Sequence, residues 1–210
     1  MEASAVRQKI KIVLAALVKG FVLGVVARAW MRWIATEPDF TWSGSIFIVI
    51  AFTIFMVNQS LVKMLRQRFK SRRSVLLIRI SGVIFSLPIF AGAGGMMFPS
   101  VALASVATWN PALGKRTKGV LLLLSLIIPV TISRDIVSDF GWSFATLGRI
   151  LLFVAIYSVV TFATKPTMSP FRNESSELVK MSKGKKILLV VAILAIGGIF
   201  FIFTVGIPGV

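Results

Sequence analysis

Apolar runs long enough to cross a membrane are the feature that most constrains this chain. A transmembrane helix needs about 20 consecutive apolar residues, and 57% of the 210 residues are hydrophobic, above the roughly 45–50% of soluble domains. We therefore predict an all-α, polytopic bundle of transmembrane helices that forms a single domain over residues 1–210. The predicted spans, about seven in number, are residues 12–27, 42–62, 75–90, 92–109, 119–133, 142–163 and 187–208.

Residues 75–109 allow one span or two, because this stretch is too long for one crossing and contains Pro88, Pro99 and a glycine-rich run. Lysine and arginine in short loops favour the cytoplasmic side of a membrane. One span in this stretch divides the loop cations about evenly between the two sides. Two spans place nearly all of them inside, with the N-terminus in the cytoplasm and the C-terminus outside. The only loop cations then left outside are Arg28, Arg32 and Arg134.

The N-terminal apolar run has a second interpretation, a cleaved signal peptide. Residues 27–29 have the small-x-small form of a cleavage site, and three cations precede the run. Against this, Lys19 interrupts the run, which is also longer than the apolar region of a typical signal peptide. We therefore favour a retained first span.

The net charge of +17 would suggest a nucleic-acid partner in a soluble protein. In a membrane protein it reflects the cytoplasmic preference of lysine and arginine, so we expect no nucleic-acid partner. Residues 63–73 are strongly basic and follow a span directly. Such a cluster attracts anionic lipid, and we expect anionic lipid at this cytoplasmic face.

The sequence contains neither histidine nor cysteine. Imidazole and thiolate supply most zinc sites, haem ligands and activated nucleophiles. We therefore predict no enzymatic activity, no catalytic residues, no cofactor and no metal site. Asp135 and Asp139 are four residues apart, so they could share a helix face and hold a divalent ion through oxygen ligands.

Three small residues in the first apolar run, Ala16, Gly20 and Gly24, are spaced by four and so share one face of a helix. Small residues in this pattern allow a second helix to approach closely in a membrane. We expect a helix-packing face here. The pattern leaves open whether the partner helix belongs to this chain, to a second copy or to another protein.

Two predicted outer loops contain similar sequences, DFTWS at 39–43 and DFGWS at 139–143. A local explanation is that Asp39 and Asp139 cap the helices that follow. The alternative is a parallel repeat of three spans, joined by the fourth. In that case Arg32 and Arg134 would pair with these aspartates or with a bound anion.

Two cations fall inside predicted spans, about 10 Å from the nearer boundary at 1.5 Å per residue. They are Lys19 and Arg149. Charges within a membrane often serve a function, but long basic side chains also extend to the interface. No acidic residue lies deep in any predicted span. If these cations face a cavity, an anionic solute or a lipid headgroup is their natural partner.

Residues 27–44, ARAWMRWIATEPDFTWSG, resemble a segment of uncharacterised multi-span integral membrane proteins of actinobacteria. The resemblance implies a bacterial plasma membrane and a shared outer-loop motif, and it implies no specific function.

Three functional hypotheses follow. The first is a non-catalytic membrane subunit or scaffold that associates through the face of Gly20 and Gly24. The second is a small carrier or channel for an anionic or polar solute, and the third is a protein that binds lipid at the outer leaflet. Residues expected to contact solute or headgroups are Lys19, Arg28, Arg32, Asp39, Arg134, Asp139 and Arg149.

Overall fold

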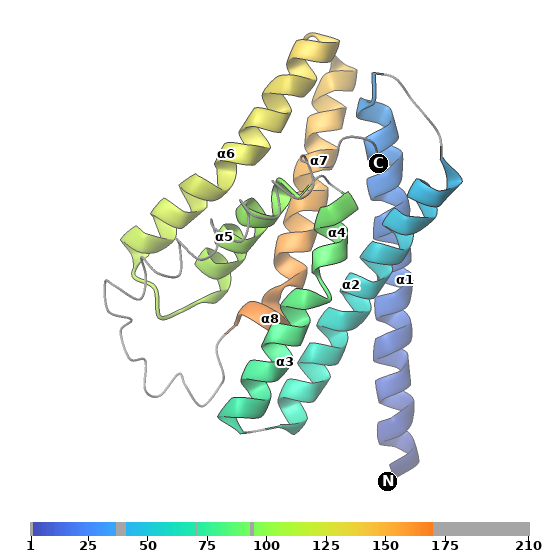
Figure 1. Cartoon of the computed structure of the whole chain (residues 1–210), viewed down its shortest axis with the longest axis vertical. Coiled ribbons are helices and arrows are strands. Elements are labelled where there is room, and N and C mark those ends of the chain that lie inside the picture. The colour runs from blue at the N-terminus through green and yellow to red at the C-terminus, as the bar shows by residue number, and fades with distance from the viewer. Residues whose placement is uncertain (1, 37–40, 70, 93–94, 170–210) are drawn as a thin grey trace. The chain divides into compact units, whose positions relative to one another are not determined.

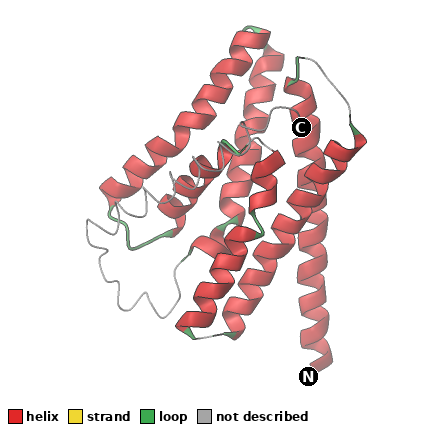
Figure 2. Cartoon of the chain, viewed as in Figure 1, coloured by secondary structure: helices red, strands yellow, loops and turns green. Residues whose placement is uncertain are grey.

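The computed structural model describes residues 2–36, 41–69, 71–92 and 95–169, and these ranges contain helices and no strand (Figure 2). The predicted all-α fold class is confirmed. The helices are α1 (Glu2–Ile34), α2 (Trp42–Arg68), α3 (Arg72–Ile84), α4 (Leu87–Gly92), α5 (Met97–Trp109), α6 (Lys115–Phe140), α7 (Phe144–Ala163) and α8 (Lys165–Met168).

Within the described ranges, five helical segments are long and apolar enough to cross a membrane. Four of them cover a predicted span completely, and the fifth begins two residues inside the predicted span at 142–163. The five segments are Val6–Ile34, Trp42–Arg68, Arg73–Ala91, Lys115–Phe140 and Phe144–Ala163. The chain is thus built as a membrane protein. The predicted span at 187–208 lies outside the described residues.

The predicted span at 92–109 differs from the structure. Here α5 has 13 residues, which is about 20 Å of helix, whereas the apolar core of a bilayer is about 30 Å thick. The helix begins only at Met97, because Gly95 just before it has a φ of +74°, a conformation that favours glycine and interrupts a helix. This helix alone is too short to cross.

The chain divides into two compact units, Met1–Gly92 and Ala93–Val210. In unit 1, α1 runs antiparallel along α2, and α3 and α4 return along α2 (Figure 1). In unit 2, α5 packs along α6, and α7 packs against both (Figure 1). The single domain over residues 1–210 stays a prediction.

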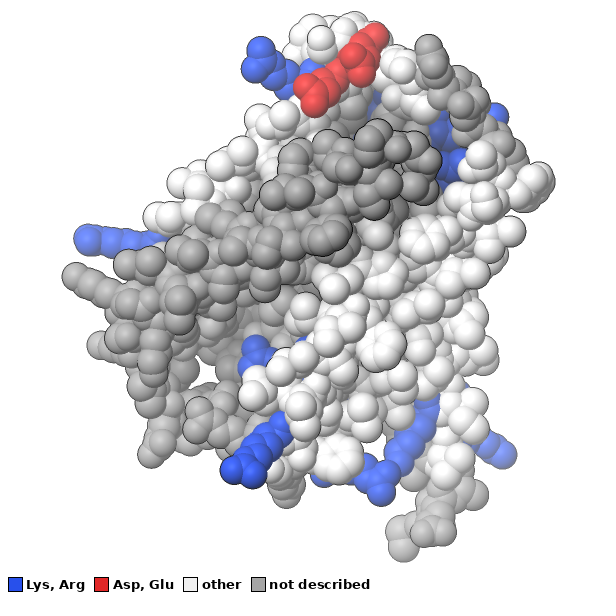
Figure 3. Space-filling view, viewed as in Figure 1, with Lys and Arg blue, Asp and Glu red and all other residues white. Residues whose placement is uncertain are grey.

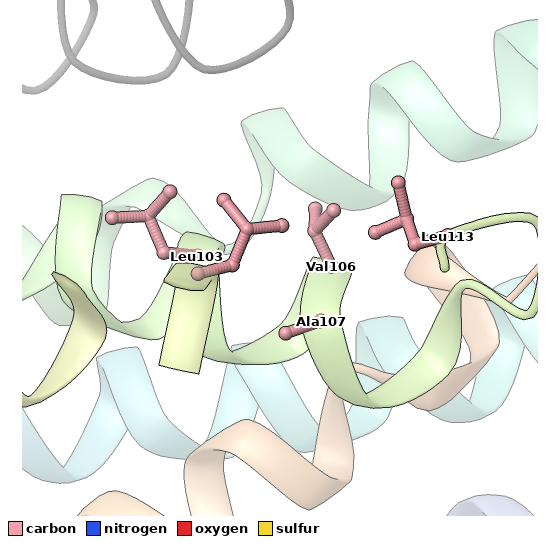
Figure 4. Close-up of a cluster of buried hydrophobic side chains, with 5 residues drawn as sticks. Leu103, Val106, Ala107 and Leu113 are labelled. Carbon is pink, nitrogen blue, oxygen red and sulfur yellow. The ribbon is translucent and has the colours of Figure 1, made fainter. Parts of the chain in front are cut away.

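The short helix α5 forms the core of unit 2. Every residue from Ser100 to Ala107 is buried. Leu103, Val106 and Ala107 of α5 cluster with Leu113 and with Leu121 of α6 (Figure 4). The predicted fourth span therefore packs within unit 2, against α6 and α7.

The turn between α6 and α7 is shorter than the predicted outer loop. The helix α6 continues to Phe140, seven residues beyond the predicted end of the span at 133. A helix of 26 residues is about 39 Å long, so its polar last turns can extend beyond the apolar core while remaining helical. Gly141, with a φ of +66°, ends α6 in a conformation that favours glycine.

Candidate functional site

The small-residue face of α1 lies directly on α2. A Cβ atom added to Gly20 would lie 2.6 Å from the Thr53 Cα, and one added to Gly24 would lie 2.8 Å from the Val49 Cα. Ala16 is also buried. The partner helix thus belongs to the same chain. The expectation that another protein docks on this face is wrong, because α2 already occupies it.

The pairing of α1 with α2 continues to the α1–α2 turn. Each step of four residues along α1, from Gly20 through Gly24 to Arg28, is matched by four residues back along α2, from Thr53 through Val49 to Ser45. Half-buried Arg28 donates from Nε to the Ser45 Oγ at 2.9 Å. That hydroxyl donates in turn to the Thr41 carbonyl oxygen at 2.9 Å. Arg28 therefore connects the end of α1 to the first turn of α2 by a hydrogen bond.

The other described contact residues of unit 1, Lys19 and Arg32, lie outside its packed interior. Arg32 is exposed in the last turn of α1. Lys19 is exposed on α1, and Asp39 lies outside the described residues. The structure does not gather the described members of this group into one site.

In unit 2, Arg149 of α7 extends toward the α6–α7 turn. Its guanidinium carbon lies 3.9 Å from the centre of the Phe140 ring, at the end of α6. A cation over an aromatic face is stabilised by the ring quadrupole. The side chain thus extends from within the span toward its end, as expected of a long basic side chain in a membrane helix.

The second DFxWS copy does not adopt the predicted capping arrangement. Asp139 and Arg134 are exposed in the last two turns of α6, and Ser143 caps α7 by accepting the Thr146 N–H at 3.1 Å. The prediction that Asp139 caps α7 is wrong, because α6 continues through Asp139.

The described parts of the two DFxWS copies have different backbones. Thr41 is extended, with a φ of −112°, whereas the matching Gly141 has a φ of +66°. Phe40 lies outside the described residues, as Asp39 does. The local backbone gives no support to a repeat.

The third span of unit 1 is interrupted between α3 and α4, where side chains form hydrogen bonds with the backbone. Where α3 ends, the Ser86 N–H bonds to the Val83 carbonyl oxygen at 2.9 Å instead of to Gly82, four residues back. The Gly82 carbonyl accepts instead from Asn58 Nδ2 at 2.9 Å and from Ser86 Oγ at 2.6 Å. Beside it, Gln59 Nε2 donates to Ser86 Oγ at 3.0 Å. Polar side chains thus bond the backbone group that the break releases.

In unit 2, side chains also donate hydrogen bonds to a released backbone carbonyl, in this case near Pro129. Proline has no N–H, so the carbonyl of Ser125, four residues earlier, loses its helical donor. The Ser100 hydroxyl of α5 donates to that carbonyl. The Tyr157 hydroxyl of α7 lies 3.4 Å from the same oxygen and 3.1 Å from Ser100 Oγ. These side chains join α5, α6 and α7 at one buried point.

A second polar cluster of unit 2 lies where α7 ends beside α5. Thr164 Oγ1 is 2.7 Å from Ser105 Oγ and 2.7 Å from the Thr161 carbonyl oxygen, which also accepts from Trp109 Nε1 at 3.2 Å. The Lys165 ammonium lies 4.8 Å from the centre of the Trp109 ring. Within the described ranges, Thr161 Oγ1 is the buried side-chain oxygen without a hydrogen-bond partner.

Sequence reasoning missed both polar clusters that bond released carbonyls. Two signals point to them in the sequence. Asn58 and Gln59 stand in an apolar helix, and Pro129 necessarily releases the carbonyl of Ser125. The donors come from other helices, which one-dimensional spacing does not bring together.

Comparison of the chain with protein-family models, with curated proteins and with solved structures finds no match. The resemblance to multi-span actinobacterial proteins therefore stays an expectation. Among the described residues, no three histidine, cysteine or acidic side chains gather as a metal site would require. The predictions of no cofactor, no metal and no catalysis stay predictions.

Proposed function

We propose that this chain is an integral membrane protein that serves as a non-catalytic subunit or scaffold of a membrane complex. The observation that supports this proposal is the role of the buried polar side chains, which in each unit donate hydrogen bonds to backbone carbonyls left without a helical donor. The two cations within the spans do not line an interior either, since Lys19 is exposed and Arg149 extends toward a helix end. Polar groups that line a solute path need to face that path. These instead hold helices together.

The proposed orientation places the α2–α3 end of unit 1 in the cytoplasm of a bacterium and the α1–α2 turn outside its plasma membrane. Basic side chains gather around the α2–α3 end of the unit (Figure 3). They include Lys63, Arg66, Arg68 and Arg73. Cations at the end of a membrane span favour the cytoplasmic side and attract anionic lipid headgroups.

Unit 2 supports an equivalent orientation by its own charges. Three cations, Lys115, Arg116 and Lys118, lie in the first turn of α6. Acidic side chains lie at the opposite, α6–α7 end (Figure 3), where Asp135 and Asp139 are exposed. The first turn of α6 would then face the cytoplasm, and the α6–α7 turn would lie outside.

A carrier for a polar or anionic solute is the second candidate. The break between α3 and α4, the short helix α5 and the unpaired Thr161 hydroxyl favour it, since interrupted helices are common where transporters bind substrate. The two candidates differ in whether the purified chain alone moves solute across a membrane.

Photo-crosslinking in native membranes tests the proposal. A photoreactive amino acid is placed at one exposed apolar position on each of the five spanning segments. These positions are Val22, Ile50, Leu77, Leu123 and Leu151. A subunit is expected to give an adduct of fixed mass at one or two of these positions, because a bound protein covers only part of the lipid-facing surface.

The control repeats the crosslinking after denaturation in dodecyl sulfate, which separates subunits and should remove the adduct. Vesicles that contain the purified chain alone are expected to retain trapped phosphate, sulfate and glucose. Release of any of these solutes by the purified chain would support the carrier and contradict the subunit. The absence of a protein adduct at all five positions would also contradict it.

A further inference from the structure

Lys19 lies at the middle of the first span. The antiparallel pairing of α1 with α2 places Arg28 at the α1–α2 end, where it bonds to Ser45, and places Lys11 toward the α2–α3 end. Lys19 is about 12–14 Å along the helix axis from each of these cations, at 1.5 Å per residue. This distance exceeds the length of a lysine side chain, so the ammonium does not reach the level of either end.

The ammonium of Lys19 also lies outside the interior of unit 1. Gly20, the next residue, is pressed against the main chain of α2, which fixes the rotation of α1 about its axis. Lys19 is exposed, and so are Ile12, Ala15 and Val22, which lie within two turns of it on the same side of the helix. We name these four residues the Lys19 face. It is an apolar strip with one central cation.

The sequence contains no acidic residue within a predicted span. Its seven acidic residues are Glu2, Glu37, Asp39, Asp135, Asp139, Glu174 and Glu177. All lie outside the predicted spans, and the described aspartates lie in the last two turns of α6. A charge at the centre of a bilayer is costly and is usually paired or placed against water or protein. We therefore expect the neutralising group for Lys19 to come from another molecule.

We propose that the Lys19 face binds a transmembrane helix of a partner protein that carries an aspartate or glutamate near mid-membrane, and that this carboxylate pairs with Lys19. The inference rests on the proposed function as a subunit and names the chemistry of its partner. Charge complementarity in an apolar medium makes the pairing both strong and selective. The small side chain of Ala15, one turn away, allows the partner helix to approach closely.

A synthetic transmembrane peptide tests this recognition directly. The probe is a 20-residue leucine-based peptide with one central glutamate, and the matched peptide has glutamine at that position. The full chain, which has no native cysteine, is labelled at Q67C on its exposed α2 end. Energy transfer to each labelled peptide is measured in phosphatidylcholine vesicles at pH 7.5. We expect the glutamate peptide to associate about tenfold more tightly.

Two further variants distinguish an ion pair from general apolar contact. Lys19→Met should abolish the preference for glutamate over glutamine, while Lys19→Arg should retain it. The matched control Lys63→Met removes an exposed cation near the end of α2 and should leave the preference unchanged. Equal binding of the two peptides to the wild-type chain, or a preference that survives Lys19→Met, would overturn the inference.

Crosslinking at Val22 in native membranes separates this inference from the proposed function. An adduct that disappears in Lys19→Met and persists in Lys19→Arg supports both. An adduct that persists in Lys19→Met leaves the chain a subunit but overturns the ion pair. An adduct with the mass of two copies also overturns the inference, because a second copy brings no carboxylate to mid-membrane.

Discussion

Gly20→Ala is expected to lower the free energy of unfolding by about 1–3 kcal/mol, the usual cost of overpacking a close-packed interior. The new methyl group would lie 2.6 Å from the Thr53 Cα and 2.9 Å from the Phe52 carbonyl oxygen. Both atoms belong to the main chain of α2, so relief requires the two helices to separate. Unfolding in mixed micelles with increasing dodecyl sulfate, followed by circular dichroism, measures the change.

Gly119→Ala is the matched control, because both substitutions add one methyl group to a helical glycine. A Cβ at Gly119 in α6 meets no atom within 4 Å. Alanine favours helix over glycine by about 1 kcal/mol, so this variant should be as stable as the wild type or more stable. Equal destabilisation by the two substitutions would show that α1 does not rest on α2 through Gly20.

Loss of both hydroxyls near the Ser125 carbonyl is the second large expected effect. Ser100→Ala with Tyr157→Phe leaves that buried carbonyl without a donor, which should cost about 1–3 kcal/mol of stability. The cause is the missing N–H of Pro129, so Pro129→Ala supplies a helical donor to the same oxygen. In a Pro129→Ala background, the double substitution should therefore destabilise the chain much less.

The comparison of the two backgrounds forms a thermodynamic cycle, measured by the same unfolding assay. The expected coupling between the hydroxyl pair and Pro129 is about 1 kcal/mol or more, in the range found for groups that share a hydrogen-bond network. A cost that is identical in both backgrounds would mean that the hydroxyls stabilise α5 and α7 for a reason unrelated to the released carbonyl.

The spans could be predicted from the sequence because a run of apolar residues has to be long enough to cross the apolar core of the membrane. The length of the apolar run does not give the length of the helix, because a helix can continue into polar residues. For this reason the sequence predicts the end of the span at 133, whereas α6 continues to Phe140. Arg134 and Asp139 lie in this continuation of the helix, beyond the predicted span. The burial of Ser100–Ala107 at the centre of unit 2 depends on contacts with other helices, which the sequence does not show.

The candidate site was less predictable from the sequence. The spacing of residues shows which of them share a face of a helix, but it does not show which helix packs on that face. The spacing of Ala16, Gly20 and Gly24 predicts a packing face, and the structure places α2 on it. Lys19 lies one residue from Gly20, and its exposure follows once that contact is known. For Arg149, the sequence left open a cavity or an interface, and the Phe140 ring decides the direction of the side chain.

Labelling of single cysteines from outside intact expressing cells is the most direct test of the account, since the chain contains no native cysteine. The variants are Ser43→Cys, Gln67→Cys, Gly114→Cys and Ser138→Cys, each at an exposed helix end. A membrane-impermeant maleimide should label residues 43 and 138 in intact cells, and 67 and 114 only after permeabilisation. Labelling of 43 and 114, with 67 and 138 protected, would invert unit 2 and contradict the seven-span arrangement. Labelling of all four positions in intact cells would contradict a membrane-spanning chain altogether.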